Sequence, residues 1–146
     1  MKSIFDETTK LELIDRINLL TEESERQWGK MTVAQMVWHC QYPLKVAVEN
    51  KNVGNGNLFV RLFLKKAMYN DKVWRQNLPT SPQLKTTENK NLKIEAEILK
   101  QLTIQTHKLK IRNKWNPHPL FGKLTKEEWG KMEYKHLDHH LTQFGV

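Results

Sequence analysis

Apolar side chains recur at intervals of three and four residues in four separate segments of the chain, and regular alternation of apolar and polar residues is almost absent. Such intervals match the turn of a helix, whereas alternation is typical of a strand. The clearest stripe contains Leu92, Ala96, Leu99, Leu102, Thr106 and Leu109. This periodicity predicts an all-α protein in which each helix buries one face.

Short capping motifs predict where two of the helices begin. Thr32 is followed three residues later by Gln35, and Thr125 by Glu128. Each pair is a capping box, whose side chains satisfy free amide groups of the first helical turn. The main helices are expected from residue 7 to about 20, from 33 toward 50, from 92 to about 109, and from 126 onward. A short extra helix is predicted in the 58–70 region.

Proline residues interrupt this helical pattern at two places. Pro43 falls inside the second main helix, and because proline has no amide hydrogen, the carbonyl of His39 loses its helical partner. We therefore expect a kink beside this histidine. Two prolines and a glycine within residues 113–123 end the third main helix. Four main helices in 146 residues predict a single-domain four-helix bundle over residues 1–146.

The composition is that of a globular protein, with 38% hydrophobic and 27% charged residues. No run approaches the roughly 18 apolar residues of a transmembrane helix, and the first residues lack the pattern of a signal peptide. The single cysteine, Cys40, has no partner for an internal disulfide and suits a reducing compartment. We expect a cytoplasmic protein.

The net charge of +8 raises the question of a nucleic-acid partner, because lysines that neutralise phosphates release counterions. The lysines are dispersed and often lie near acids, which favours a solvated surface over nucleic-acid binding. The densest basic stretch contains Arg61, Lys65, Lys66, Lys72 and Arg75. This stretch leaves an alternative function open, a noncatalytic protein that binds an acidic partner or nucleic acid through a basic helical surface.

The last predicted helix contains three histidines within five residues. At about 100° per residue, His136 and His140 fall at about 20° and 60° on a wheel that starts at Thr125, on the same side as Trp129 and Met132. A buried imidazole needs partners for its nitrogens, and two rings four residues apart can share a metal ion. The pair is either two metal ligands or two core histidines bonded to side chains or water.

His39 is the best candidate for a third ligand, although it lies at the edge of the apolar stripe of its helix. With His136 and His140 it would form a three-imidazole site for a divalent ion. Zinc and nickel are favoured, and imidazole also suits copper and iron. Three protein ligands leave a coordination position open, as in catalytic zinc sites.

Other side chains of the last helix are weaker candidates. Glu133, one turn before His136, is a candidate general base or extra ligand, and the alternative is a snorkelling or ion-paired glutamate. His139 lies at the border of the apolar face, so we expect it to be half exposed and a poorer ligand than His140. The polar arc of this helix contains Lys131, Lys135, Asp138 and Thr142.

Outside the last helix, His118 is expected to order the loop that precedes it, and His107 is expected to be exposed. Cys40 diverges from its neighbour His39 by about 100° and should be a small buried hydrophobe. Three tryptophans either line a pocket or simply fill the core. They are Trp38, Trp115 and Trp129.

Two segments, "WGKMTVAQMVWHC" and "HPLFGKLTKEEWGKMEYKHLDHHLTQFGV", resemble the DinB-like (DinB/YfiT) superfamily, in particular an uncharacterised branch of it. The resemblance extends over about residues 24–50 and 115–146, and only loosely over 51–90. It implies a bundle of up-down-down-up topology, often dimeric, with His39, His136 and His140 as ligands of a divalent metal. Characterised relatives include metal-dependent thiol transferases and mycothiol-dependent isomerases. The resemblance therefore implies a metal-dependent transferase or hydrolase that acts on a small molecule, with a low-molecular-weight thiol as a candidate cosubstrate.

Overall fold

The computed structural model describes residues 1–50, 70–78 and 84–146. Its helices are α1 (Glu7–Asn18), α2 (Val33–Glu49), α4 (Leu92–Lys108) and α5 (Lys126–Gln143), with the short 3-10 helix η2 (Leu109–Ile111) after α4. The four predicted main helices and the all-α class are thus confirmed, and the described residues form no strand. The short helix predicted in the 58–70 region lies outside the described residues, except for Asn70, which is in a bend. None of the helices in the described ranges is long and apolar enough to cross a membrane.

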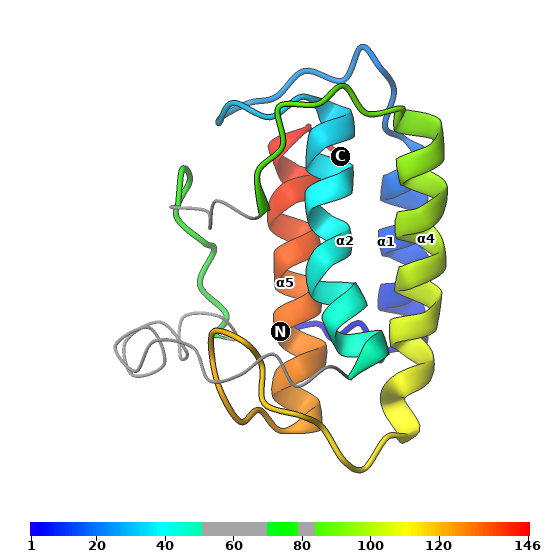
Figure 1. Ribbon diagram of the computed structural model, residues 1–146, viewed down its shortest axis with the longest axis vertical. Helices are drawn as coiled ribbons and strands as arrows, with labels where there is room; N and C mark the ends of the chain where they lie inside the picture. The colour runs from blue at the N-terminus through cyan, green and yellow to red at the C-terminus, as the bar shows by residue number, and fades with distance from the viewer. Residues whose placement is uncertain (51–69, 79–83) are drawn as a thin grey trace.

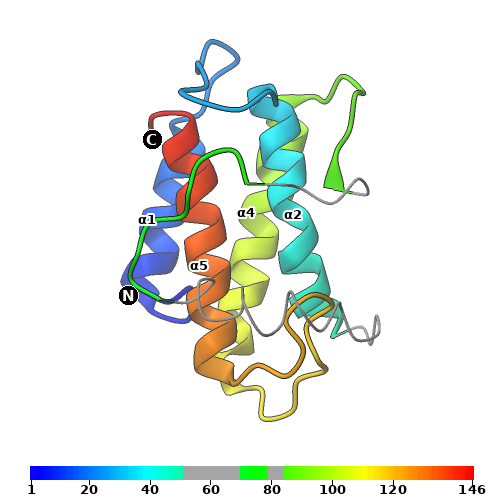
Figure 2. The same cartoon turned by 90° about the vertical axis from the view of Figure 1, so that its left-hand side faces the viewer.

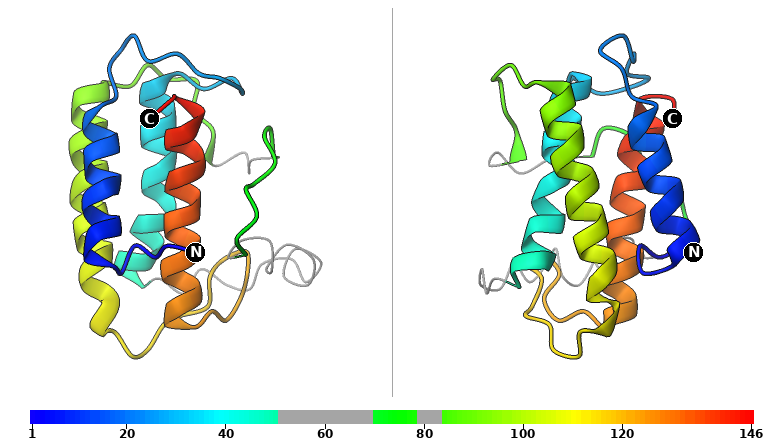
Figure 3. Two further views of the ribbon diagram at one scale, coloured as in Figure 1. Left: turned by 180° about the vertical axis from the view of Figure 1, so that it is seen from behind. Right: turned by 90° about the vertical axis from the view of Figure 1, so that its right-hand side faces the viewer.

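The four helices lie side by side, and hydrogen bonds between them show their directions (Figures 1, 2 and 3). The side chain of Gln41 on α2 donates to the carbonyl of Glu95 near the start of α4, while Arg112 after α4 donates to Ala47 near the end of α2. These two helices therefore run parallel. The amide of Ile4 donates to Gly130, and Arg16 pairs with Asp138 farther along α5, so α1 and α5 also run parallel. The colours of Figure 1 show α1 and α5 running opposite to α2 and α4.

Both predicted capping boxes are present. The hydroxyl of Thr32 accepts from the amide of Gln35 at 3.2 Å, and the side chain of Gln35 accepts from the amide of Thr32 at 3.0 Å. Thr125 and Glu128 make the same reciprocal pair at the start of α5, at 3.1 and 2.8 Å. A cap of this kind stabilises a helix by about 1 kcal/mol. The two helices that contain the candidate ligands thus begin where local sequence predicts.

The apolar stripes of the four helices meet in a common core. Its fully buried members include Leu13 of α1, Val37, Cys40 and Leu44 of α2, Leu99 of α4, and Leu137 and Leu141 of α5. A second cluster at the start of α5 contains Val46, Ala47, Phe121, Trp129 and Met132. Burial of each large side chain is worth roughly 1.5–3 kcal/mol. Cys40 is buried as predicted, and Trp129 belongs to the core.

Two predictions of exposure are wrong, because segments distant in sequence cover the side chains. His107 is only 5% exposed. Its Nδ1 donates to the carbonyl of Ile4 at 3.0 Å, and its Nε2 lies 3.0 Å from the carboxylate of Glu7. Lys135, placed on the polar arc of α5, is 6% exposed because its Nζ donates to the backbone and side-chain oxygens of Asn70.

Candidate metal centre

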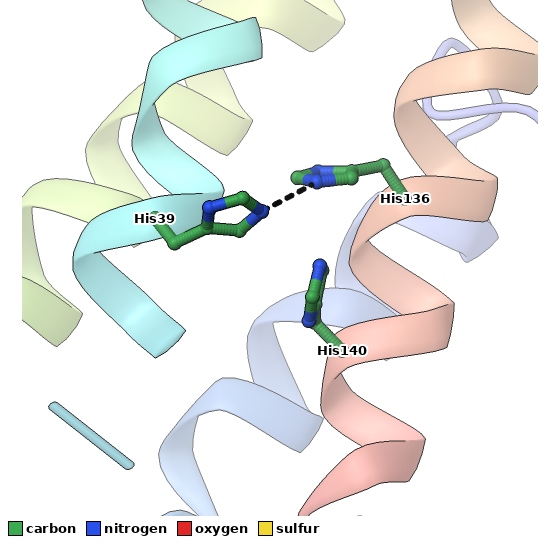
Figure 4. A group of neighbouring side chains, drawn as sticks. All are labelled: His39, His136 and His140. Atoms are coloured by element: carbon green, nitrogen blue, oxygen red, sulfur yellow. Dashed lines mark hydrogen bonds between the residues drawn. The ribbon is translucent and has the colours of Figure 1, made fainter. Parts of the chain in front are cut away.

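The structure brings His39, His136 and His140 together between α2 and α5 (Figure 4). The ring centroids of His39 lie 5.2 Å from His136 and 4.7 Å from His140, and the latter two are 4.8 Å apart. Each ring offers one nitrogen to a common space, and these three nitrogens lie within 4.8 Å of one another. The predicted convergence of residues from distant parts of the chain is therefore confirmed.

Helix geometry explains why His136 and His140 lie together, and helix packing explains why His39 joins them. His136 and His140 stand four residues apart on α5, so their rings project from the same face one turn apart. His39 lies on α2, which packs against α5 in the opposite direction. Local helix signals do not place His39 beside this pair; only the packing of α2 on α5 sets its ring opposite them.

 

Hydrogen bonds fix the outer nitrogen of two of the three rings. Nδ1 of His39 lies 3.0 Å from the carbonyl oxygen of Leu84, and Nδ1 of His140 lies 2.9 Å from Oε1 of Gln143. Both oxygens only accept, so each Nδ1 carries the hydrogen and each Nε2 keeps its lone pair. Gln143 is oriented in turn, because its Nε2 donates to the carbonyl of Trp28 at 2.7 Å. Outer bonds of this kind are typical of metal-binding histidines.

His136 differs from the other two rings. Its Nε2 lies 3.2 Å from Nε2 of His39. Because Nε2 of His39 is a bare acceptor, Nε2 of His136 carries the hydrogen in this arrangement. Nδ1 of His136 is then an acceptor, and it is buried without a partner among the described residues. Two nitrogens about 2.0–2.1 Å from one zinc ion at the tetrahedral angle are roughly 3.3 Å apart, so the observed spacing suits a shared ion.

Burial keeps all three imidazoles neutral. Desolvation lowers the pKa of His39, and it lowers the pKa of His140 to about 3. The pKa of His136 lies well below its ordinary value, first because of burial and then because of repulsion by the other two rings. A metal ion binds the neutral imidazole. At neutral pH the three rings therefore need not lose a charge to bind a metal, and imidazole nitrogens suit a divalent transition-metal ion.

Comparison with protein families gives one finding. The family model described as "Protein of unknown function (DUF1569)" matches residues 5–145. The chain belongs to this family. No curated protein and no solved structure matches the chain. The description of the DUF1569 family names neither an activity nor the DinB-like superfamily.

Glu133 of this DUF1569 chain has a buried carboxyl group. It is 1% exposed, and both of its carboxyl oxygens lack a hydrogen-bond partner among the described residues. The interpretation of Glu133 as a snorkelling or ion-paired glutamate is therefore wrong. Burial raises the pKa of its carboxyl group to about 8. Glu133 is mostly protonated at neutral pH, which makes its burial without an ion pair tolerable.

The remaining candidates lie outside the group of three histidines. His139 is half-buried, and its ring centroid is 5.1 Å from that of His140. Asp138 pairs with Arg16 at 2.6 Å, in keeping with its place on the polar arc. His118 orders its loop as predicted, because its Nδ1 accepts from the amides of Leu120 and Phe121. Its burial lowers its pKa to about 4.

A cavity of about 570 Å³ borders the site through Trp74 and His139. The ring of Trp74 lies 6.0 Å from that of His136 and 5.5 Å from that of His139, and Trp28 lies 5.5 Å from His139. Cavities of this size hold small molecules in many proteins. Other lining residues include Lys2, Asp71, Tyr134 and Lys135.

Several residues of the site were not predicted from the sequence. Trp28, Trp74 and Leu84 lie in irregular segments, where no periodicity marks a side chain or carbonyl as part of a site. Gln143 could have been found, because it stands three residues after His140 on the same helix and a glutamine there can reach the ring. The basic stretch of the alternative function lies mostly outside the described residues.

Proposed function

We propose that this protein binds a divalent metal ion through His39, His136 and His140 and uses it in chemistry on a small molecule. The observation that carries the proposal is the convergence of three neutral imidazoles, two of which have their outer nitrogens tied to Leu84 and Gln143. Nε2 atoms that face one another, as in His39 and His136, are expected of metal ligands and are not required of histidines that only fill the core. The resemblance to the DinB-like superfamily implies the same three ligands and supports the proposal.

The three imidazoles carry no charge, so they leave the charge of a bound ion uncompensated. When bound, such an ion supplies Lewis-acid chemistry, which eases the loss of a proton from water or a thiol. The three ligands also leave room for a further group, as catalytic zinc sites do. Zinc or nickel is the ion we propose.

The adjoining cavity supports a small-molecule substrate. Trp28 and Trp74 offer flat apolar walls, and His139 contributes an imidazole. A substrate held there would lie beside the histidine group, because the rings of Trp74 and His139 in the cavity wall contact those of His136 and His140. We propose a transferase in which a thiol gives its proton to solvent, and the thiolate sulfur then bonds to an electrophilic carbon while the leaving group departs with the electron pair of the broken bond. The second reaction we propose is hydrolysis, in which water takes the place of the thiol.

The first test is metal analysis of protein purified without a histidine tag. About one zinc or nickel ion per chain is expected for the wild type. H39A, H136A and H140A should each lose the ion. H139A is the matched control, since it removes an adjacent histidine outside the group, and it should keep the ion. A wild type that takes up neither zinc nor nickel, with unchanged thermal stability, would overturn the proposal.

The chemistry has its own test. The metal-loaded protein is assayed with cysteine plus 1-chloro-2,4-dinitrobenzene for thiol transfer, and with p-nitrophenyl acetate for hydrolysis. Turnover by the wild type that is lost in H136A and kept in Q101A, which changes an exposed residue of α4 outside the cavity, supports an enzyme. Metal binding without turnover of either probe removes the two reactions tested and leaves the metal site in place.

A further inference from the structure

The three candidate ligands are not equally supported. Nδ1 of His39 has the carbonyl of Leu84 as a partner, and Nδ1 of His140 has the side chain of Gln143. Nδ1 of His136 has no partner among the described residues, although it is buried. A metal ion on Nε2 of His136 requires the ring hydrogen to be on Nδ1. The loaded site therefore needs an acceptor beside His136 that the other two rings already have.

Glu133 stands one helical turn before His136 on α5. Residues three apart on a helix are neighbours on its surface. Both carboxyl oxygens of Glu133 are buried without a partner among the described residues. The pKa of the Cys40 thiol on α2 is raised by burial first and by the charge of Glu133 second. An unsatisfied acceptor and an unsatisfied ring nitrogen thus lie on neighbouring positions of one helix.

We propose that Glu133 is the positioning residue of His136, and that its carboxyl group accepts the Nδ1 hydrogen when Nε2 binds the metal ion. This inference rests on the proposed metal site. It gives Glu133 a role other than ligand or general base, because Glu133 acts through the ring of His136. The bond is direct after a side-chain rotation, or it passes through one water molecule.

The proposal accounts for a costly feature of the fold. A buried carboxyl group without a hydrogen bond destabilises a protein. Leucine or methionine would fill the same space without that cost. A carboxylate beside His136 would hold the required tautomer, raise the basicity of the ring and balance part of the charge of the ion. The carboxyl group of Glu133 therefore destabilises the metal-free fold and strengthens metal binding by His136.

The experiment compares the zinc affinity of wild type, E133L and E133Q by competition with a chromophoric chelator. E133L removes the acceptor and should weaken binding about 10–100-fold. E133Q keeps an acceptor oxygen without the charge, so its zinc affinity should lie between those of the wild type and E133L. The matched control is E97Q, which changes an exposed acid on α4 and should bind as the wild type does.

Unfolding of the metal-free variants separates this role from a structural one. We expect metal-free E133L to be as stable as the wild type or more stable, although it binds zinc more weakly. If E133L does not fold, weaker zinc binding by folded E133Q carries the test. Zinc affinities of E133L and E133Q within about twofold of the wild type would overturn the inference about Glu133. A wild type that binds no zinc would instead overturn the metal site itself.

Discussion

Gln143 and His140 share a hydrogen bond of 2.9 Å between Oε1 and Nδ1, and the same glutamine donates to the carbonyl of Trp28 at 2.7 Å. The loop after α1 thus sets the tautomer of a candidate metal ligand on α5. This chain of contacts makes the loop part of the metal site.

Replacement of Gln143 by alanine should weaken zinc binding by about tenfold, because Nδ1 of His140 loses the acceptor that holds its ring and tautomer. Zinc affinity from chelator competition measures the effect. Q101A is the matched control, since Gln101 is exposed on α4 and far from the histidines in sequence. Equal affinities of Q143A and wild type would show that the hydrogen bond does not support the site.

Replacement of Gly29 by alanine should destabilise the fold and disturb Gln143. Gly29 has φ +83°, and a Cβ atom there would lie 2.5 Å from Nε2 of Gln143. A left-handed conformation costs an L-residue roughly 1–2 kcal/mol, and the contact adds to this cost. Urea unfolding of G29A, Q143A and the double variant measures both parts. The double variant should be less destabilised than the sum of the two, because Q143A removes the clash; additive effects would contradict this.

The stability of the metal-free protein should fall with rising pH because of Glu133. Its pKa is raised from 4.5 to about 8 in the folded protein. The stabilisation relative to the unfolded chain is complete below pH 4.5 and is lost as the pH rises toward 8. The loss amounts to about 1.4 kcal/mol per pH unit. Urea unfolding with a chelator at several pH values should show that E133Q gains on the wild type as the pH rises; a constant difference would refute the raised pKa.

The buried histidines should act in the opposite direction. The pKa of His140 is lowered from 6.5 to about 3, so the unfolded chain gains a proton below pH 6.5 that folded His140 does not. Stability from this residue is complete above pH 6.5 and is lost as the pH falls toward 3. Between pH 6.5 and 5, metal-free H140N should lose stability less steeply than wild type, by up to about 1.4 kcal/mol per pH unit. Parallel curves for the two proteins would contradict the prediction.

Local sequence predicted those features that depend on residues within a few positions of each other. The capping boxes at Thr32 and Thr125 mark helix starts, because their hydrogen bonds span only three residues. His136 and His140 share a face for the same reason, since a helical turn brings residues four apart together. His39 was the best candidate for a third ligand although helical phase left it at the edge of its stripe, and the resemblance to the DinB-like superfamily implied the same residue.

Tertiary structure decided what each of these side chains meets. His107 is buried because the segment before α1 reaches it, and Lys135 because Asn70 lies over it. Leu84 and Trp28 reach the site from irregular segments, and Glu133 remains without a partner among the described residues. A helical pattern reports the direction of a side chain relative to its own helix. Its neighbours belong to other segments, so their identity, and with it the protonation state and the chemistry of the ring or carboxyl group, is set only when the helices pack.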